Sequence, residues 1–144
     1  MILISHRGNL NGPQKKYENH PDYLNEALNE NFDIEIDLFL YDKYLWLGHD
    51  LPQYKINDIE WLKNKRIWCH AKNIKTLNFL IKENDIHCFF HQNDDVTLTS
   101  RGFIWTYPNK QVFDKSILVI ENRIAKEEMP SCYGICTDYV NDLK

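Results

Sequence analysis

The chain has 144 residues, of which 17 are Lys or Arg and 21 are Asp or Glu, so its formal net charge is −4 with neutral histidines. A composition of 43% apolar and 26% charged residues is typical of an ordered globular protein and excludes a disordered chain. The mildly acidic balance, with no run of Lys and Arg, argues against a nucleic-acid partner.

Strand-like and helical patterns alternate over the first 85 residues, and strand-like runs follow one another after that. In chain order, the predicted elements are a strand at Ile2–Ser5, a helix at Pro21–Glu30, strands at Phe32–Leu38 and Tyr44–Leu47, a helix at Asn57–Lys63, a strand at Arg66–Ala71, a helix at Asn73–Glu83, and strands at Ile86–Phe90, Phe103–Tyr107, Ile117–Ile120 and Gly134–Thr137. Pro21 suits a first helical position, and Asn57 and Asn73 suit caps. The alternation predicts βαβ units and a parallel sheet.

Most of the predicted strands end in a polar residue that can do chemistry. These residues are His6, Asp37, His70 with Lys72, His91, Glu121 and Asp138. The carboxyl ends of parallel strands form one face, which carries the active site in α/β folds. A complete barrel needs about 200 residues or more. We therefore expect an α/β fold in one domain, residues 1–144, that is a reduced or incomplete (β/α)8 TIM-type barrel with helices missing in its second half.

The strand-like segment from Asp33 to Leu38 alternates acidic and apolar residues. Its period of two places Asp33, Glu35 and Asp37 on one face. If that face points into a barrel, the carboxylates repel one another, and a hard divalent cation such as Mg²⁺ or Ca²⁺ relieves the repulsion. The alternative is an edge strand whose acids lie in solvent.

Two short turns carry histidines. His6-Arg7-Gly8 follows the first strand, where a histidine can transfer protons and an arginine can hold a phosphate oxygen. Gly48-His49-Asp50 follows the strand at Tyr44–Leu47 and offers a second acid–base group, although a His-Asp pair of this kind can also be merely a turn.

In their order and spacing, four motifs resemble the glycerophosphodiester phosphodiesterase family, which belongs to the phospholipase C-like phosphodiesterases. The motifs are His6-Arg7-Gly8, Glu18-Asn19, Glu35-x-Asp37 and His49-Asp50, and Thr137-Asp138-Tyr139 is similar to the closing strand end of the family. The resemblance covers residues 1–50, about a third of the chain. Tyr17, His20 and Val140 depart from the family pattern.

The resemblance implies a role for individual residues. His6 and His49 match the two catalytic histidines, and Glu35 and Asp37 match metal ligands. Arg7 matches a phosphate contact.

In the segment Cys69-His70-Ala71-Lys72, Lys72 matches a lysine near the phosphate. His70 stands where the family has a third acidic ligand. A nitrogen ligand there admits Mn²⁺ or Zn²⁺ beside Mg²⁺ or Ca²⁺.

The function implied by the resemblance is hydrolysis of a small, glycerophosphodiester-like phosphodiester by a metal-dependent phosphoric diester hydrolase. One histidine would act as base and the other as acid. Two alternatives stay open: a non-catalytic relative that binds a phosphorylated small molecule, and a phosphomonoesterase or sugar-phosphate lyase. Barrel surface without helices would suit a second copy of the chain in a homo-oligomer.

The apolar runs, such as Ser116–Ile120, are too short to span a bilayer. The N-terminal residues lack a basic leader followed by an apolar run of signal length. We therefore expect a cytoplasmic protein with no membrane span.

Overall fold

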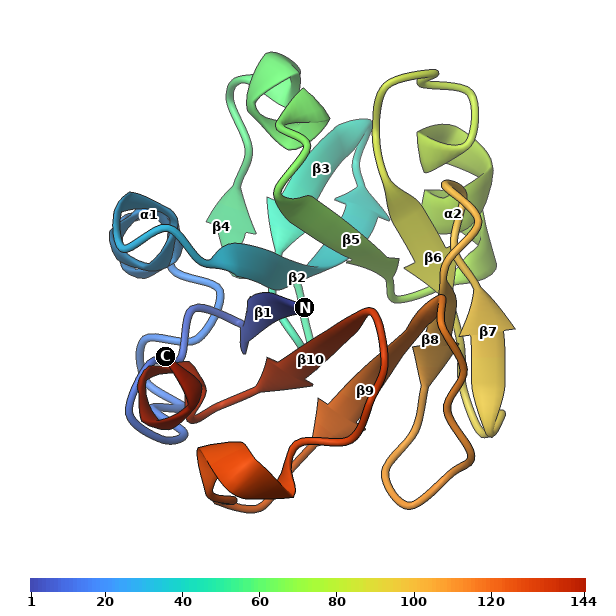
Figure 1. Ribbon diagram of the computed structural model, residues 1–144. Helices are drawn as coiled ribbons and strands as arrows, with labels where there is room; N and C mark the ends of the chain where they lie inside the picture. Colours follow the sequence, from blue (N-terminus) through green and yellow to red (C-terminus); the bar gives the residue numbers. More distant parts are fainter.

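A ten-stranded sheet curls around the centre of the computed structural model, which describes residues 1–144 (Figure 1). In chain order, the elements are β1 (Ile2–His6), α1 (Pro21–Asn29), β2 (Asp33–Tyr41), β3 (Tyr44–Leu47), β4 (Tyr54–Lys55), the 3₁₀ helix η1 (Ile59–Lys63), β5 (Ile67–Ala71), α2 (Ile74–Leu80), β6 (Cys88–Phe90), β7 (Val96–Leu98), β8 (Ile104–Thr106), β9 (Ser116–Ile120), the 3₁₀ helix η2 (Lys126–Glu128), β10 (Gly134–Thr137) and the 3₁₀ helix η3 (Val140–Leu143).

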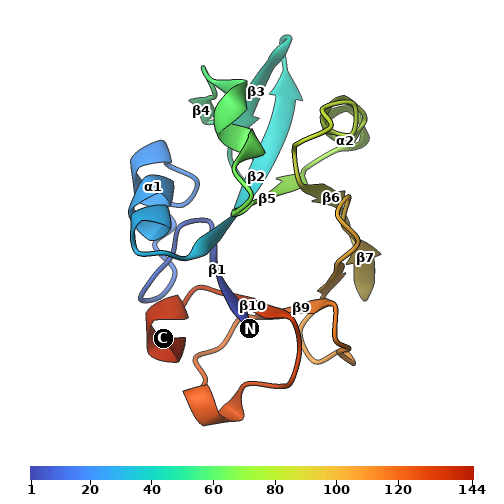
Figure 2. The ribbon, with the colours of Figure 1, turned by 45° about the horizontal axis from the view of Figure 1, so that its top comes forward.

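The central strands of the sheet are parallel. Strand β1 pairs with β2 on one side and with β10 on the other, β2 continues to β5 and β6, and β10 continues to β9 and β8. Three strands run antiparallel to their neighbours: β3 on β2, β4 on β3, and β7 on β8. Figure 2 looks along the curl, with β1, β2, β5 and β6 on one side and β7, β9 and β10 on the other.

The two ends of the curled path, β6 and β7, meet without forming a strand ladder. Thr97 Oγ1 in β7 donates a hydrogen bond to the Phe90 carbonyl (2.9 Å), and the Ser100 amide donates to the Cys88 carbonyl (2.8 Å). We call this junction the β6–β7 seam. The seam brings the last strand of the helical half of the chain against the start of the helix-poor half.

The expectation of a reduced (β/α)8 TIM-type barrel is wrong. The structure is a mixed, curled sheet that forms a half-barrel, with only two α-helices, and no series of βα units repeats around it. One reason lies in the turn between β2 and β3, where Asp42 and Lys43 both adopt positive φ (46° and 68°). Two such residues make a tight hairpin, so the chain returns antiparallel beside β2 instead of crossing over through a helix.

Most of the predicted elements are confirmed to within a few residues. Strands β3 and β10 have the predicted bounds, and α1 and α2 begin at or beside the predicted proline and asparagine. The segment at Asn57–Lys63 is a 3₁₀ helix capped by Asp58 rather than an α-helix capped by Asn57. The sequence reading missed β4 and β7, which have two and three residues.

Alternation along β2 divides the buried residues into two layers. Ile34, Ile36 and Leu38 are fully buried on the outer face, where α1 and α2 pack against the sheet. A second cluster fills the space inside the curl and consists of Ile4, Trp68, Phe89, Trp105, Ile117 and Cys136. This inner cluster forms a floor beneath the polar residues at the strand ends.

Two further observations concern the whole chain. No helix has the length and apolar character needed to cross a membrane. All four cysteines are free, and Cys69, Cys88 and Cys136 are buried.

His87 gives the fold a measurable acid sensitivity. Its ring is 1% exposed, packs on Trp68 with 4.1 Å between ring centroids, and has Nε2 2.8 Å from Thr99 Oγ1. Burial, helped by the charge of Arg101, lowers the pKa of His87 from 6.5 to about 3. The unfolded chain therefore binds a proton more readily than the folded one between these values, and stability is lost as the pH falls through that range.

We expect the free energy of unfolding of His87→Gln to decrease less steeply at low pH than that of the wild type. In the wild type the free energy of unfolding should fall by up to about 1.4 kcal/mol for each pH unit below 6.5 because of His87. Urea unfolding of both proteins at a series of pH values measures the difference. Parallel stability profiles for the two proteins would show that His87 does not carry the effect.

Candidate functional site

Polar side chains gather inside the curl, where β1, β2, β5 and β10 end. They line a pocket of about 390 Å³. Its lining residues are His6, Arg7, Glu35, His49, His70, Lys72, His91, Gln92, Trp105, Tyr107, Val119 and Glu121. The structure therefore brings together most of the residues that the sequence singled out for chemistry. Asp37 and Asp138 do not line the pocket, but each contacts residues that do.

The acidic face of β2 points into the curl and not into solvent. Glu35 is 2% exposed and Asp37 is fully buried, which excludes the alternative of an exposed edge strand. Parallel pairing sets His6 of β1 beside Glu35 and His70 of β5 beside Asp37. The alternation in the sequence of β2 therefore places Glu35 and Asp37 on the same inward face, where they form the acidic side of the pocket.

Asp37 is held by three cationic or polar neighbours. Arg7 Nε lies 2.8 Å from Oδ2, and Lys72 Nζ lies 3.0 Å from Oδ1. Asn19 donates from Nδ2 to Asp37 Oδ2 (2.9 Å) and accepts from the Asp37 amide (3.0 Å). Burial alone would raise the pKa of Asp37, but His70, Arg7 and Lys72 outweigh it, so the pKa lies far below its usual range.

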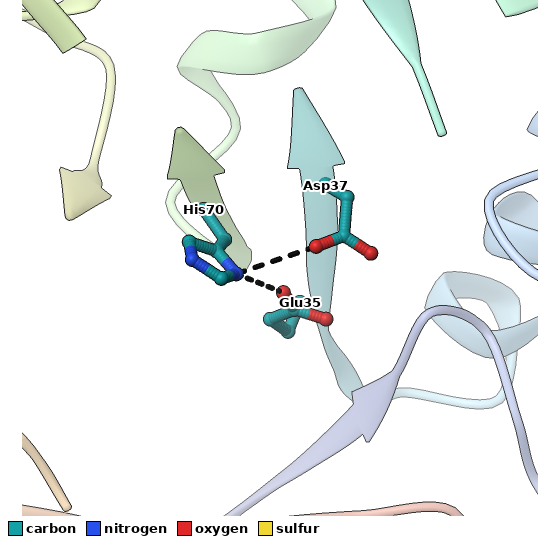
Figure 3. Close-up of side chains that lie close together, drawn as sticks. All are labelled: Glu35, Asp37 and His70. Carbon is teal, nitrogen blue, oxygen red and sulfur yellow. Dashed lines mark ion pairs between the residues drawn. The ribbon is translucent and has the colours of Figure 1, made fainter. Parts of the chain in front are cut away.

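Glu35, Asp37 and His70 form the acidic cluster shown in Figure 3. His70 Nδ1 lies 3.3 Å from Asp37 Oδ1 and 3.6 Å from Glu35 Oε1. One ligand atom from each of the three residues lies within 4.8 Å of the others. Glu35 Oε2 is buried and has no hydrogen-bond partner. A buried carboxylate oxygen without a partner is costly, and a divalent cation is a chemically suitable partner for it.

The ring of His70 is fixed by stacking. It lies parallel to Phe89, with 5.0 Å between centroids and 9° between planes, and against His91 at 5.1 Å. Burial alone would lower the pKa of His70, but Asp37 and Glu35 outweigh it and raise the pKa.

His6 faces the acidic cluster from β1. Its Nδ1 lies 2.9 Å from Asp138 Oδ1, and its Nε2 lies 3.9 Å from Glu35 Oε2. Burial opposes a charge on the ring, but the hydrogen bond with Asp138 and the charge of Glu35 raise the pKa of His6. Asn9 in turn donates to Asp138 (2.7 Å) and to Glu18 (3.0 Å), which fixes both carboxylates.

The turn after β1 is locally strained. Arg7 and Asn19 adopt left-handed conformations with φ of 55° and 62°, which are uncommon for residues with a side chain. At Gly8, with φ of 92°, a Cβ would lie 2.8 Å from the Tyr23 ring. Strained backbone of this kind is maintained only where surrounding contacts hold it in place, and such positions are common at binding sites.

His49 reaches the pocket from the turn after β3. Its side chain is 42% exposed, and its Nδ1 lies 2.7 Å from Asp50 Oδ1. Gly48 is required before it, because a Cβ there would lie 2.0 Å from the Leu51 carbonyl oxygen.

Three further residues belong to the site, although none of them was assigned a catalytic, phosphate-binding or metal-binding role. Asn9 and Asn19 orient the acidic groups. The sequence signal for Asn9 is its closeness to His6-Arg7-Gly8, and the signal for Asn19 is its place in the Glu18-Asn19 motif. Tyr107 hydrogen-bonds to Nε2 of His91, whose Nδ1 is buried without a partner. Burial, with the charges of His70 and Lys72, lowers the pKa of His91 to about 4.

Comparisons with known proteins give one relative. No family model matches the chain, and no solved structure matches it. The chain is 27% identical over 79 residues to an uncharacterized RNA pseudouridine synthase of Mycoplasma capricolum subsp. capricolum. The match covers 55% of this chain and 26% of the relative, so the chain spans about a quarter of that protein.

These comparisons correct the expectation drawn from the short motifs. Membership of the glycerophosphodiester phosphodiesterase family is wrong, since no family model matches and the relative is named as a different kind of enzyme. The predicted metal-dependent phosphoric diester hydrolase acting on a small phosphodiester is wrong for the same reason, and its alternatives gain no support. The exclusion of nucleic acid is also wrong, because the relative is named for RNA.

The error has a physical cause. The motifs comprise only a few residues each and covered about a third of the chain, and histidines with carboxylates at strand ends serve many chemistries. The net charge was a poor guide to a nucleic-acid partner, because it is a sum over the whole protein and does not describe the charge of one pocket.

Proposed function

We propose that the central pocket binds a nucleotide unit of RNA beside a divalent cation and carries out proton transfer on it. Glu35, Asp37 and His70 would hold the cation, Arg7 and Lys72 would contact the phosphate, and His6 and His49 would transfer protons. The observation that carries the proposal is the convergence of these seven groups on one pocket of about 390 Å³, a volume suited to a small ligand.

The cation is supported by the chemistry of the acidic cluster. Two carboxylates and an imidazole are close enough to share one ion, and Glu35 Oε2 makes no hydrogen bond. Oxygen ligands suit Mg²⁺, and the nitrogen of His70 also suits Mn²⁺ or Zn²⁺. Stacking on Phe89 fixes the orientation of the His70 ring before an ion binds.

The charge balance of the pocket explains why a cation matters for an anionic ligand. The buried or half-buried charges at its base are Arg7 and Lys72 against Glu35 and Asp37, which cancel. A divalent cation adds two positive charges at the same place. Phosphate binding is therefore expected to need the ion, although the chain as a whole is acidic.

RNA as the ligand class is supported by the relative, whose name specifies RNA. The pocket also offers what a nucleotide requires: cationic groups for the phosphate, and Tyr107 among its lining residues as aromatic surface for a base or sugar. The proposal places the chain in the cytoplasm, where four free thiols would stay reduced.

Proton transfer is supported by the placement of the two histidines. Both line the pocket, and each has Nδ1 at a carboxylate, of Asp138 for His6 and of Asp50 for His49. A carboxylate on one ring nitrogen orients the other for exchange with a ligand.

A binding measurement tests this proposal. Fluorescence anisotropy of a labelled oligouridylate should show binding in Mn²⁺ or Mg²⁺ that weakens at least about tenfold, or ~1.4 kcal/mol, when EDTA removes the ion. Lys72→Met should weaken binding and lower the dependence on salt, whereas Lys75→Met, an exposed lysine of α2 outside the pocket, should not. No binding by the wild type with cation, or equal binding in EDTA, would contradict the proposal.

A further inference from the structure

A second hollow lies beside the central pocket. It has a volume of about 290 Å³ and lies between the turn after β1 and the turn after β3. Arg7 and His49 line both hollows, so the two are neighbours that share a wall. The other lining residues of the second hollow do not line the central pocket and are mostly polar: Lys15, Glu18, Asn19, Asp50, Leu51 and Gln53.

We infer that the second hollow binds the next nucleotide of the same RNA strand, so that the chain recognises two consecutive nucleotides. This inference rests on the proposed function of the central pocket. It goes beyond that proposal because it assigns a separate binding site and makes the ligand an RNA strand instead of a free mononucleotide.

Arg7 is suited to the junction between the two sites. Its Nε faces Asp37 in the central pocket, and its Nη1 lies 3.3 Å from Glu18, which lines the second hollow. Its Nη2 is in no ion pair or hydrogen bond with the protein. A guanidinium fixed at two of its nitrogens presents the third to a phosphate at low cost in side-chain entropy.

The rest of the second hollow fits the parts of a nucleotide. Lys15 is exposed and forms no ion pair, so its ammonium is available to a phosphate. The Leu51 side chain is 57% exposed and offers an apolar surface for a base, and the amide of Gln53 can both donate and accept hydrogen bonds at a base edge.

The acidic groups of the second hollow already have partners within the protein. Glu18 accepts hydrogen bonds from Arg7 and Asn9, and Asp50 lies 2.7 Å from His49. Both carboxylates therefore already have partners in the protein, and Lys15 is the lining cation that forms no ion pair.

The test compares uridine 5′-monophosphate (pU) with the dinucleotide pUpU by calorimetry in the presence of Mn²⁺. We expect pUpU to bind the wild type about tenfold more tightly than pU. Lys15→Gln should remove most of this advantage, lower the salt slope of pUpU binding by about 0.7, and leave pU binding unchanged. Lys16→Gln, at the adjacent residue that does not line the second hollow, should behave like the wild type.

The outcomes separate this inference from the proposed function. Equal affinities of the wild type for pU and pUpU would overturn the second site and leave the central pocket as proposed. A pUpU advantage that survives Lys15→Gln and a Gln53→Ala change would also overturn it. If neither pU nor pUpU binds, both the proposed function and the second site are wrong.

Discussion

Replacing Asp37 by Asn is expected to lower the free energy of unfolding by about 3–5 kcal/mol, the usual cost of removing one partner from a buried ion pair. Asp37 is fully buried and compensates both Arg7 and Lys72. An amide keeps the shape and the contact with Asn19, but it removes the one ion-pair partner of Lys72 and leaves Arg7 paired with Glu18 alone. Because Asn has nearly the same volume as Asp, the decrease in the free energy of unfolding reports the lost charge compensation and not the creation of a cavity.

Urea unfolding at neutral pH measures this effect. Asp50→Asn is the matched control, because it makes the same chemical change at a carboxylate that is 87% exposed and pairs only with His49. The control should lie within about 0.5 kcal/mol of the wild type. A similar small change for Asp37→Asn would show that Arg7 and Lys72 are compensated by other groups.

Replacing Glu35 by Gln is expected to weaken binding of a divalent cation by about 100-fold or more, since changes even in the groups that orient metal ligands cost 10–100-fold. The fold should tolerate this change better than a change at Asp37, because Glu35 Oε2 makes no hydrogen bond that the amide would break. Isothermal titration of Mg²⁺, Mn²⁺ and Ca²⁺ into both proteins gives the affinities.

The control for Glu35 is Glu121→Gln, which changes an exposed carboxylate that lines the same pocket outside the acidic cluster. It should bind each ion as the wild type does. The order of the ions is informative too, because His70 as a nitrogen ligand favours Mn²⁺ over Ca²⁺. Equal affinity of the wild type and Glu35→Gln would show that the acidic cluster holds no ion.

Local patterns predicted the strands well and the architecture poorly. The alternation in β2 foretold which side chains face the helices and which face inward, because a strand has a fixed period of two. The direction of a neighbouring strand depends instead on turn geometry, such as the two positive φ angles at Asp42 and Lys43. That geometry was not read from the sequence, and a barrel of parallel strands was expected in its place.

The sequence predicted many of the residues that form the site, but not what the site binds or does. Polar residues at parallel strand ends converge because of topology, so His6, Asp37 and Asp138 could be placed together from the sequence. Asn9 and Asn19 could not, because their roles depend on loop conformations. What a pocket of histidines and carboxylates acts on depends on the whole surrounding surface, which short motifs do not describe.

The β6–β7 seam has a mechanical consequence. Parting β1 from β10 breaks a ladder of four registered residue pairs, whereas parting β6 from β7 breaks isolated bonds from Thr97 and around Ser100. Opening the curl at the seam therefore costs less free energy than opening it between β1 and β10. His91 directly follows β6, so the wall of the pocket that carries its ring is the compliant one, while the wall that carries Glu35 and Asp37 stays rigid.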